Sequence, residues 1–236
     1  QILQNCLQLN DGTGDFQEIA HLAGVAATDW SWGALMLDFD NDGLKDIFVS
    51  NGIFRDITDR DFRDFISDKE NIRELVSETN RADWRDFMTY LPSTKISNYA
   101  FKNQGNLSFE NQAAEWGLAE PSFSNGSAYG DLDNDGDLEL VVNNVNMPSF
   151  VYQNHTVEKA GNNYLKIKLN GSAENPLGVG VKVRIYSKGR MQEAQHFLSR
   201  GFQSGVEPGL LFGLGKTELV DTVQVIWPNQ QQQMLT

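Results

Sequence analysis

Acidic side chains recur at alternate positions in two short stretches of the sequence. Residues 38–46 read DFDNDGLKD and residues 131–139 read DLDNDGDLE, so acids occupy loop positions one, three, five and nine, with glycine at six. Carboxylates at this spacing converge on one point, where like charges repel unless a cation lies among them. Oxygen ligands without Cys or His favour Ca²⁺ over a zinc-type site. The sequence therefore predicts two calcium sites.

The predicted ligands are the acidic side chains of each loop and the backbone carbonyl at position seven. In the first loop they are Asp38, Asp40, Asp42, Leu44 and Asp46. In the second loop they are Asp131, Asp133, Asp135, Asp137 and Glu139. Extracellular calcium modules have dissociation constants of about 10⁻⁴–10⁻³ M, so we expect affinities in that range and a structural role for the ion.

Neither loop has the pattern of an EF-hand, which places a bidentate Glu at position twelve and lies between two helices. Position twelve is Val49 in one loop and Val142 in the other, inside an apolar run that is typical of a strand. The alternative interpretation is a turn rich in Asp, Asn and Gly that binds no ion. Two copies in the same register favour calcium over that alternative.

The two loops belong to a longer internal repeat. Asp38 and Asp131 are 93 positions apart, and the same offset aligns residues 10–51 with residues 103–144 without a gap. A third copy begins at residues 150–154, which resemble residues 99–103. An insertion of 42 residues after the first loop explains the long offset, and without it the repeat is 51 residues long. That length is close to a propeller blade of about 50 residues.

The insertion, about residues 52–94, has a different character from the repeats. Apolar residues recur there at helical spacing, and Ser67 with Glu70 forms a capping-box pattern. We expect short amphipathic helices inserted between blades, either as a packing cover on the β core or as a partner-binding surface. The apolar positions are Phe62, Phe65, Ile66, Ile72, Leu75, Val76, Trp84, Phe87, Met88 and Leu91.

The last third of the chain is predicted to be a separate β domain. Residues 156–163 are polar and are interpreted as a linker, and residues 164–236 contain alternating apolar and polar runs broken by glycines. The predicted fold is mainly β. A partial calcium-binding propeller of about two blades with its helical insertion (residues 1–155) is followed by a small antiparallel, sandwich-like domain (164–236).

Composition excludes some partners. The net charge of −13 argues against nucleic acids and anionic membrane surfaces, since both attract basic proteins. There is no run of about 18 apolar residues, so no membrane-spanning segment is predicted. The single cysteine, Cys6, cannot form an internal disulfide.

No catalytic arrangement is predicted. The three histidines show no spacing for a Ser-His-Asp site, and the acids outside the two loops are interpreted as solvated surface charge. Paired carboxylates can cleave glycosides, so a carbohydrate-active enzyme is the competing hypothesis. Exposed tryptophans could stack on sugars, although a core role is the simpler expectation. The residues concerned are His21, His155, His196, Asp56, Asp59, Asp61, Asp64, Glu115, Trp30, Trp32, Trp84, Trp116 and Trp227.

The acidic loops in blade-length repeats resemble the FG-GAP/VCBS repeats of integrin-like β-propellers. Three C-terminal segments, RGFQS (200–204), LFGLG (211–215) and VQVIWP (223–228), resemble the ASPIC/UnbV domain. The combination resembles the cartilage acidic protein family and its Bacteroidetes relatives. The second loop departs from the usual pattern only at Glu139, where the family usually has Asp.

The resemblance implies a calcium-stabilised propeller at the cell surface or outside the cell, with more blades upstream in the full-length protein, because a full propeller has about 4–8 blades. The calcium-binding propeller and the partner-sized insertion favour a non-enzymatic module for adhesion or for binding a protein or glycan ligand. The alternative is an accessory part of a carbohydrate-active surface enzyme or of a glycan-uptake system.

Overall fold

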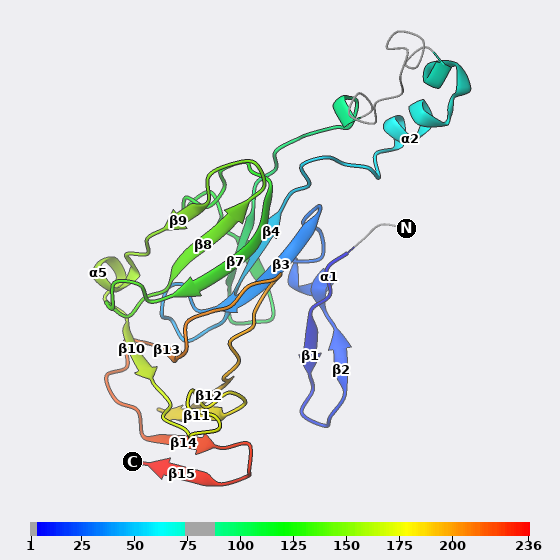
Figure 1. The fold of residues 1–236 in the computed structure, drawn as a ribbon. Coiled ribbons are helices and arrows are strands. Elements are labelled where there is room, and N and C mark those ends of the chain that lie inside the picture. The colour runs from blue at the N-terminus through cyan, green and yellow to red at the C-terminus, as the bar shows by residue number, and fades with distance from the viewer. Residues whose placement is uncertain (1–3, 74–87) are drawn as a thin grey trace.

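The structure is a computed structural model that describes residues 4–73 and 88–236. Two antiparallel sheets form its centre (Figure 1). The strands of the first sheet, in spatial order, are β3 (Ser31–Leu37), β4 (Asp46–Asn51), β5 (Tyr99–Asn103) and β6 (Phe109–Asn111). Those of the second sheet are β7 (Ser124–Gly130), β8 (Glu139–Asn144) and β9 (Phe150–Tyr152).

The strand boundaries reproduce the internal repeat. An offset of 93 residues carries the bounds of β3 onto those of β7 and the bounds of β4 onto those of β8. The N-terminal hairpin, β1 (Gln8–Asn10) and β2 (Phe16–Glu18), maps by the same offset onto the end of β5 and onto β6. The hairpin is therefore equivalent to the outer half of a blade, and the first sheet is a complete four-stranded blade.

The blades pack face to face through alternate strand residues. Leu35, Phe48 and Ala100 of the first sheet are fully or almost fully buried in one cluster with Leu140 and Val142 of the second. The opposite face of the first sheet is covered by the N-terminal hairpin and α1 (Ala20–Ala23). β4 thus buries both of its faces along its whole length, whereas β3 leaves Trp32 and Met36 exposed.

The insertion leaves β4 and returns into β5, so it interrupts one blade and does not lie between two blades. Its first helix, α2 (Arg60–Ser67), buries none of its residues and projects away from the sheets (Figure 1). The interpretation as a packing cover is therefore wrong for α2. The predicted helical positions 75, 76, 84 and 87 lie outside the described residues.

The predicted capping box in the insertion is also wrong. Ser67 ends α2, and its hydroxyl donates to the carbonyl of Arg63 at 2.6 Å. The Asp68 carboxylate instead accepts the N–H of Glu70 at 2.8 Å, and residues 69–73 are helical. A carboxylate is the better acceptor at a helix N-terminus because it also interacts with the helix dipole.

The C-terminal part contains two small antiparallel sheets, which supports the mainly β fold class. They enclose a core that includes Val183, Ile185 and Phe212. The predicted linker contains α5 (Thr156–Ala160). The strands are β10 (Asn163–Ile167) paired with β13 (Leu210–Gly215), and, in order, β12 (Arg190–Gln195), β11 (Lys182–Ser187), β14 (Thr222–Ile226) and β15 (Gln232–Leu235).

A segment of this C-terminal part lies along the inner strands of both blades. A Cβ at Gly33 of β3 would lie 3.0 Å from the N atom of Phe202, and one at Gly126 of β7 would lie 3.2 Å from the carbonyl oxygen of Phe202. Gly33 and Gly126 are equivalent by the offset of 93. The repeat therefore keeps glycine at this position because the backbone of the C-terminal part approaches too closely for a side chain.

Candidate metal centre

The first acidic loop connects β3 to β4 and brings three carboxylates together. Oxygens of Asp38, Asp40 and Asp42 all lie within 4.8 Å of one another. Asp38 is buried, and its two oxygens accept the N–H of Asp42 at 3.1 Å and that of Gly43 at 2.9 Å. Gly43 has a positive φ of 90°, which glycine adopts at low cost. The loop thus folds back on its own first acid.

The acid at position nine has a different role from the other three. Both oxygens of Asp46 accept backbone N–H groups, from Phe39 at 3.0 Å and from Asn103 at 2.9 Å. Glu139 does the same in the second loop, accepting from Leu132 at 2.7 Å and from Asn154 at 3.4 Å. This carboxylate clamps the start of the loop to the end of the third strand of the blade.

Sequence reasoning missed the asparagines that take part in this clamp. The amide of Asn103 donates to the carbonyl of Lys45 at 3.0 Å, and the amide of Asn154 donates to the equivalent carbonyl, that of Leu138, at 3.3 Å. The repeated Asn was visible as part of the third repeat start, but its partners lie on a strand that is distant in the sequence. Only the sheet pairing brings them together.

The second loop holds two overlapping clusters that share one acid. Asp131, Asp133 and Glu139 form one, and Asp135, Asp137 and Glu139 form the other, with oxygens within 4.8 Å in each. Asp131 is 5% exposed and Asp137 is 1% exposed, yet one oxygen of each has no hydrogen-bond partner among the described residues. Buried oxygens without a donor are costly, and a bound cation is one way to satisfy them. The donor set therefore fits an oxygen-binding cation such as Ca²⁺.

Burial raises the pKa of several of these acids. The pKa of Asp38 rises to about 6 and that of Asp46 to about 7, mainly because burial disfavours the charged form. Burial is also the main cause of the raised pKa of Asp42, Asp135 and Glu139. A divalent cation would favour the ionised form and oppose these shifts.

Cationic and amide side chains also contact the loops. Lys102 ion-pairs with Asp40 and lies 3.7 Å from Asp42. In the second blade the equivalent residue is Gln153, which donates to Asp133 at 3.0 Å. Each blade therefore places a donor from its third strand on the position-three acid, and the first loop receives a full positive charge where the second receives a neutral amide.

The C-terminal part covers both loops. Lys166 of β10 ion-pairs with Asp131 at 2.8 Å, and the N–H of Gly215 donates to the carbonyl of Asn41 at 2.8 Å. The two loops also contact each other, since the amide of Asn41 donates to the carbonyl of Gly136 at 2.9 Å. The predicted sites are thus neighbours at one junction, which the sequence did not indicate.

The structure brings together most of the predicted side-chain ligands. Asp38, Asp40 and Asp42 converge in the first loop, whereas Asp46 is held by backbone N–H groups beside them. The five acids of the second loop fall into two clusters of three that share Glu139. Metal binding by the backbone carbonyls at position seven, of Leu44 and Asp137, stays a prediction. The N–H groups of these two residues donate to the position-five acid of their own loop, at 2.8 Å and 3.1 Å. The Asp137 side chain is an additional acid in its cluster.

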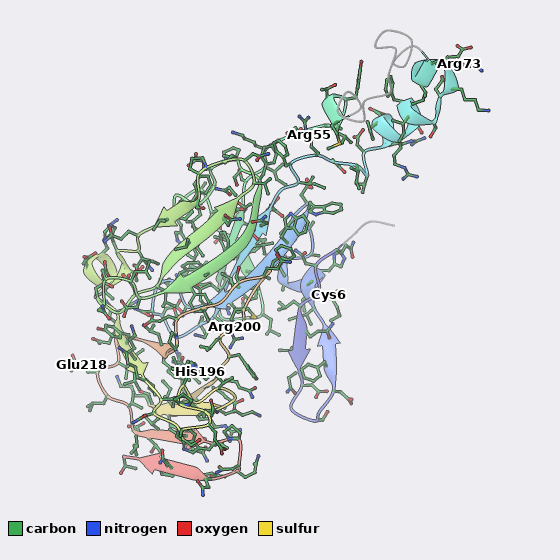
Figure 2. All side chains as sticks on the ribbon, in the orientation of Figure 1. Cys6, Arg55, Arg73, His196, Arg200 and Glu218 are labelled. Atoms are coloured by element: carbon green, nitrogen blue, oxygen red, sulfur yellow. The ribbon has the colours of Figure 1, made fainter. Side chains whose placement is uncertain are left out.

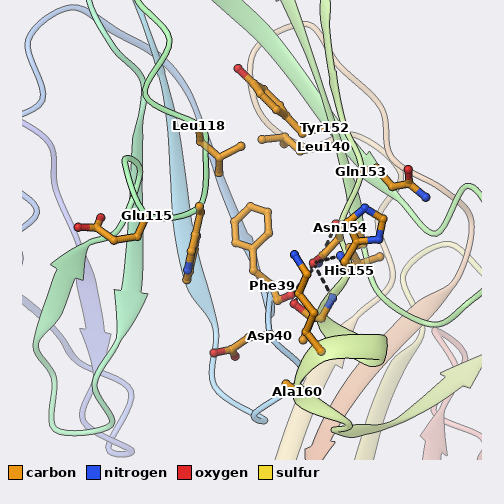
Figure 3. A pocket seen from close by; sticks show the side chains of 14 residues that line it. Phe39, Asp40, Glu115, Leu118, Leu140, Tyr152, Gln153, Asn154, His155 and Ala160 are labelled. Carbon is orange, nitrogen blue, oxygen red and sulfur yellow. Dashed lines mark hydrogen bonds between the residues drawn. The ribbon is translucent and has the colours of Figure 1, made fainter.

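A cavity of about 350 Å³ opens beside the first loop, between the two blades (Figure 3). Phe39 and Trp116 line it with ring centroids 5.3 Å apart. Tyr152 also lines the cavity. Its hydroxyl is buried and has no hydrogen-bond partner among the described residues. Polar side chains such as Glu115 and His155 complete the lining. Aromatic walls with a few polar groups are typical of small-ligand pockets.

Comparison with known protein families supports both halves of the resemblance. Residues 4–49 match the family model described as FG-GAP-like repeat, and residues 171–236 match the one described as ASPIC and UnbV. No curated protein matches the chain. The two matches indicate an extracellular-type repeat module. The second loop lies outside both matched segments, so its assignment rests on the internal repeat.

Within the described residues, none of the helices is both long and apolar enough to cross a lipid bilayer.

Proposed function

We propose that the chain is a non-enzymatic, calcium-stabilised binding module that acts outside the cell or at its surface. The observation that carries the proposal is the pair of buried, unpartnered oxygens on Asp131 and Asp137, within clusters that share Glu139. A cation at this point supplies positive charge that offsets the cost of burying these acids. The first loop offers a comparable set of three acids.

The ion would link parts of the chain that lie far apart in sequence. Each loop joins two strands of a blade, and both loops contact the C-terminal part through Lys166 and Gly215. Holding the loops in one conformation therefore preserves the surface on which that part docks. The proposed role of calcium is structural, and ligand binding belongs to other surfaces of the module.

Calorimetric titration of metal-stripped protein tests the calcium sites. We expect two sites with dissociation constants of about 10⁻⁴–10⁻³ M and a rise in the melting temperature on calcium addition. A matched pair of variants, Asp133→Asn in the second loop and Asp221→Asn outside both loops, separates ligand loss from a general charge effect. Absence of heat at several millimolar calcium would contradict the proposal.

The cavity beside Phe39 and Trp116 is our candidate ligand site. An aromatic face next to polar groups suits the apolar face and the hydroxyls of a sugar ring, which favours a glycan over a protein ligand for this cavity. α2 of the insertion offers a second, protein-sized surface because it buries none of its residues.

A glycan array followed by a polysaccharide release assay distinguishes binding from catalysis. We expect binding without product release, and we expect Trp116→Leu to lose that binding while Trp227→Leu, in the C-terminal core, retains it. Product release by the purified chain would refute the non-enzymatic assignment. The second candidate function is an accessory part of a carbohydrate-active surface system, which also predicts glycan binding. It gains support if a secreted partner enzyme cleaves the bound glycan faster in the presence of the chain.

A further inference from the structure

A second cavity lies between the inner strands of the blades and the C-terminal part. Its volume is about 300 Å³, at the lower end of the roughly 300–1,000 Å³ of small-molecule sites. Apolar side chains from both partners form its walls, among them Leu37 of β3, Leu138 before β8 and Leu210 of β13. It is distinct from the cavity beside Trp116, with which it shares the lining residue Leu138. Five charged residues also line it: Lys45, Lys166, Glu193, Arg200 and Glu207.

Three of these five charges are neutralised by direct ion pairs. Lys166 lies 3.0 Å from Glu207 and also pairs with Asp131 at 2.8 Å. Glu193 accepts a hydrogen bond from Arg184 at 2.5 Å. These contacts account for both acids of the lining and for one of its cations.

The other two cations, Lys45 and Arg200, lack such a partner. No carboxylate lies within 4.0 Å of either cationic group in the part of the chain that the structure describes. Arg200 donates from Nη2 to the carbonyl of Gln195 at 2.8 Å, but its Nε is buried and has no hydrogen-bond partner among the described residues. Burial lowers the pKa of Lys45, while Asp38 and Asp46 attract its ammonium group and Arg200 repels it.

The acids nearest Lys45 are already engaged. Asp38 accepts two backbone N–H groups of its own loop, and Asp46 accepts those of Phe39 and Asn103. Burying an unpaired guanidinium nitrogen costs free energy because it loses its hydrogen bonds to water. The junction therefore has two cations that line one cavity, and among the described residues no carboxylate forms an ion pair with either.

We propose that this cavity binds a small organic acid, with its carboxylate between Lys45 and Arg200 and its apolar body against the leucine walls. Arg200 lies where the lower ends of β3 and β7 approach the C-terminal strands (Figure 2). A carboxylate accepts hydrogen bonds from Arg and Lys simultaneously. The site joins a residue of the first acidic loop to one of the C-terminal part, so the ligand would strengthen the junction between them.

Isothermal titration of the full chain, in millimolar calcium, with benzoate and with its neutral isostere benzamide tests the proposal. Benzoate should bind and benzamide should not, because only the former carries the charge. A hydrogen bond to a charged group contributes a factor of about ten or more to a binding constant, so Lys45→Met and Arg200→Gln should each weaken benzoate binding by at least about tenfold.

Two control variants, Lys182→Met and Arg190→Gln, make the same replacements at exposed cations of the C-terminal part. Both should leave benzoate binding unchanged. Circular dichroism and the melting temperature check that each variant folds, and Lys45→Met keeps the test decisive if Arg200→Gln does not fold. Competition by inorganic sulfate supports the anion site. The proposal would be overturned if benzoate does not bind or if benzamide binds equally well. It would also be overturned if neither Lys45→Met nor a folded Arg200→Gln reduces benzoate binding. Because calcium heats are measured separately, this outcome would leave the calcium sites standing.

Discussion

Replacing Gly213 by Ala should disrupt the contact between the C-terminal part and the first acidic loop. Gly213 lies in β13, and an added Cβ would be 2.6 Å from both the Cα and the carbonyl carbon of Asn41 and closer still to an oxygen of Asp38. Ordinary carbon contacts begin at about 3.4 Å, and Asn41 presents rigid backbone at this point. The strand or the loop must therefore move.

The expected cost follows from that overlap. Overpacking by one methyl group destabilises by about 1–3 kcal/mol, which for a chain of this size corresponds to a fall in melting temperature of about 2–12 °C. The loop side of the clash includes Asp38, so we also expect weaker calcium binding at the first loop and unchanged binding at the second. Differential scanning calorimetry and calcium titration measure both effects.

Gly209→Ala is the matched control. It lies in the same part of the chain, and its nearest neighbour for an added Cβ is the carbonyl of Ile167 at 3.8 Å, an ordinary contact. We expect its melting temperature to stay within about 1–2 °C of the unmodified chain, since surface changes are typically within 0.5 kcal/mol. If Gly213→Ala matches this control in stability and in calcium binding, the close docking of β13 on the loop is refuted.

Three further predictions concern the loops and the insertion. In metal-free protein, the pKa of Asp38 is raised to about 6 and that of Asp46 to about 7, against 3.8 for an ordinary Asp. The stability that these two acids contribute is therefore present at low pH and is lost as pH rises toward 7. Thermal unfolding should show a lower melting temperature at pH 7 than at about pH 5 without calcium, and calcium should remove the difference; a melting temperature that rises over this range without calcium contradicts the assignment. Asp40→Ala and Asp133→Ala should lower the melting temperature only when calcium is present, and an equal loss with and without calcium would argue against them as ligands. Deleting residues 53–94, which leaves between β4 and β5 a connection of the same length as residues 145–149 between β8 and β9, should preserve calcium binding; loss of calcium binding in a folded product would show that the insertion supports the loops.

Local patterns in the sequence were sufficient for the loops, the strands that flank them and the duplication. Alternating acids with a glycine at position six specify a tight turn, because the constraint acts over a few bonds. An offset of 93 then places the same turn and strands twice, and the strand bounds of the structure follow it. The matches at residues 4–49 and 171–236 agree with the resemblance drawn from the same motifs.

The sequence did not reveal how these elements meet. The clamp formed by Asp46 and Asn103 depends on the pairing of β4 with β5 across the insertion. The same pairing places the insertion inside one blade, whereas the sequence placed it between two.

The junction of the blades with the C-terminal part was likewise decided by tertiary structure alone. Lys166 reaches Asp131 from 35 positions away, and Lys45 and Arg200 share a cavity although they are far apart along the chain. Spacing in a sequence reports which side chains share a turn or a strand face. Which charges are finally paired, and which are left facing a cavity, depends on packing between distant segments, since burial and electrostatic environment are properties of the folded chain.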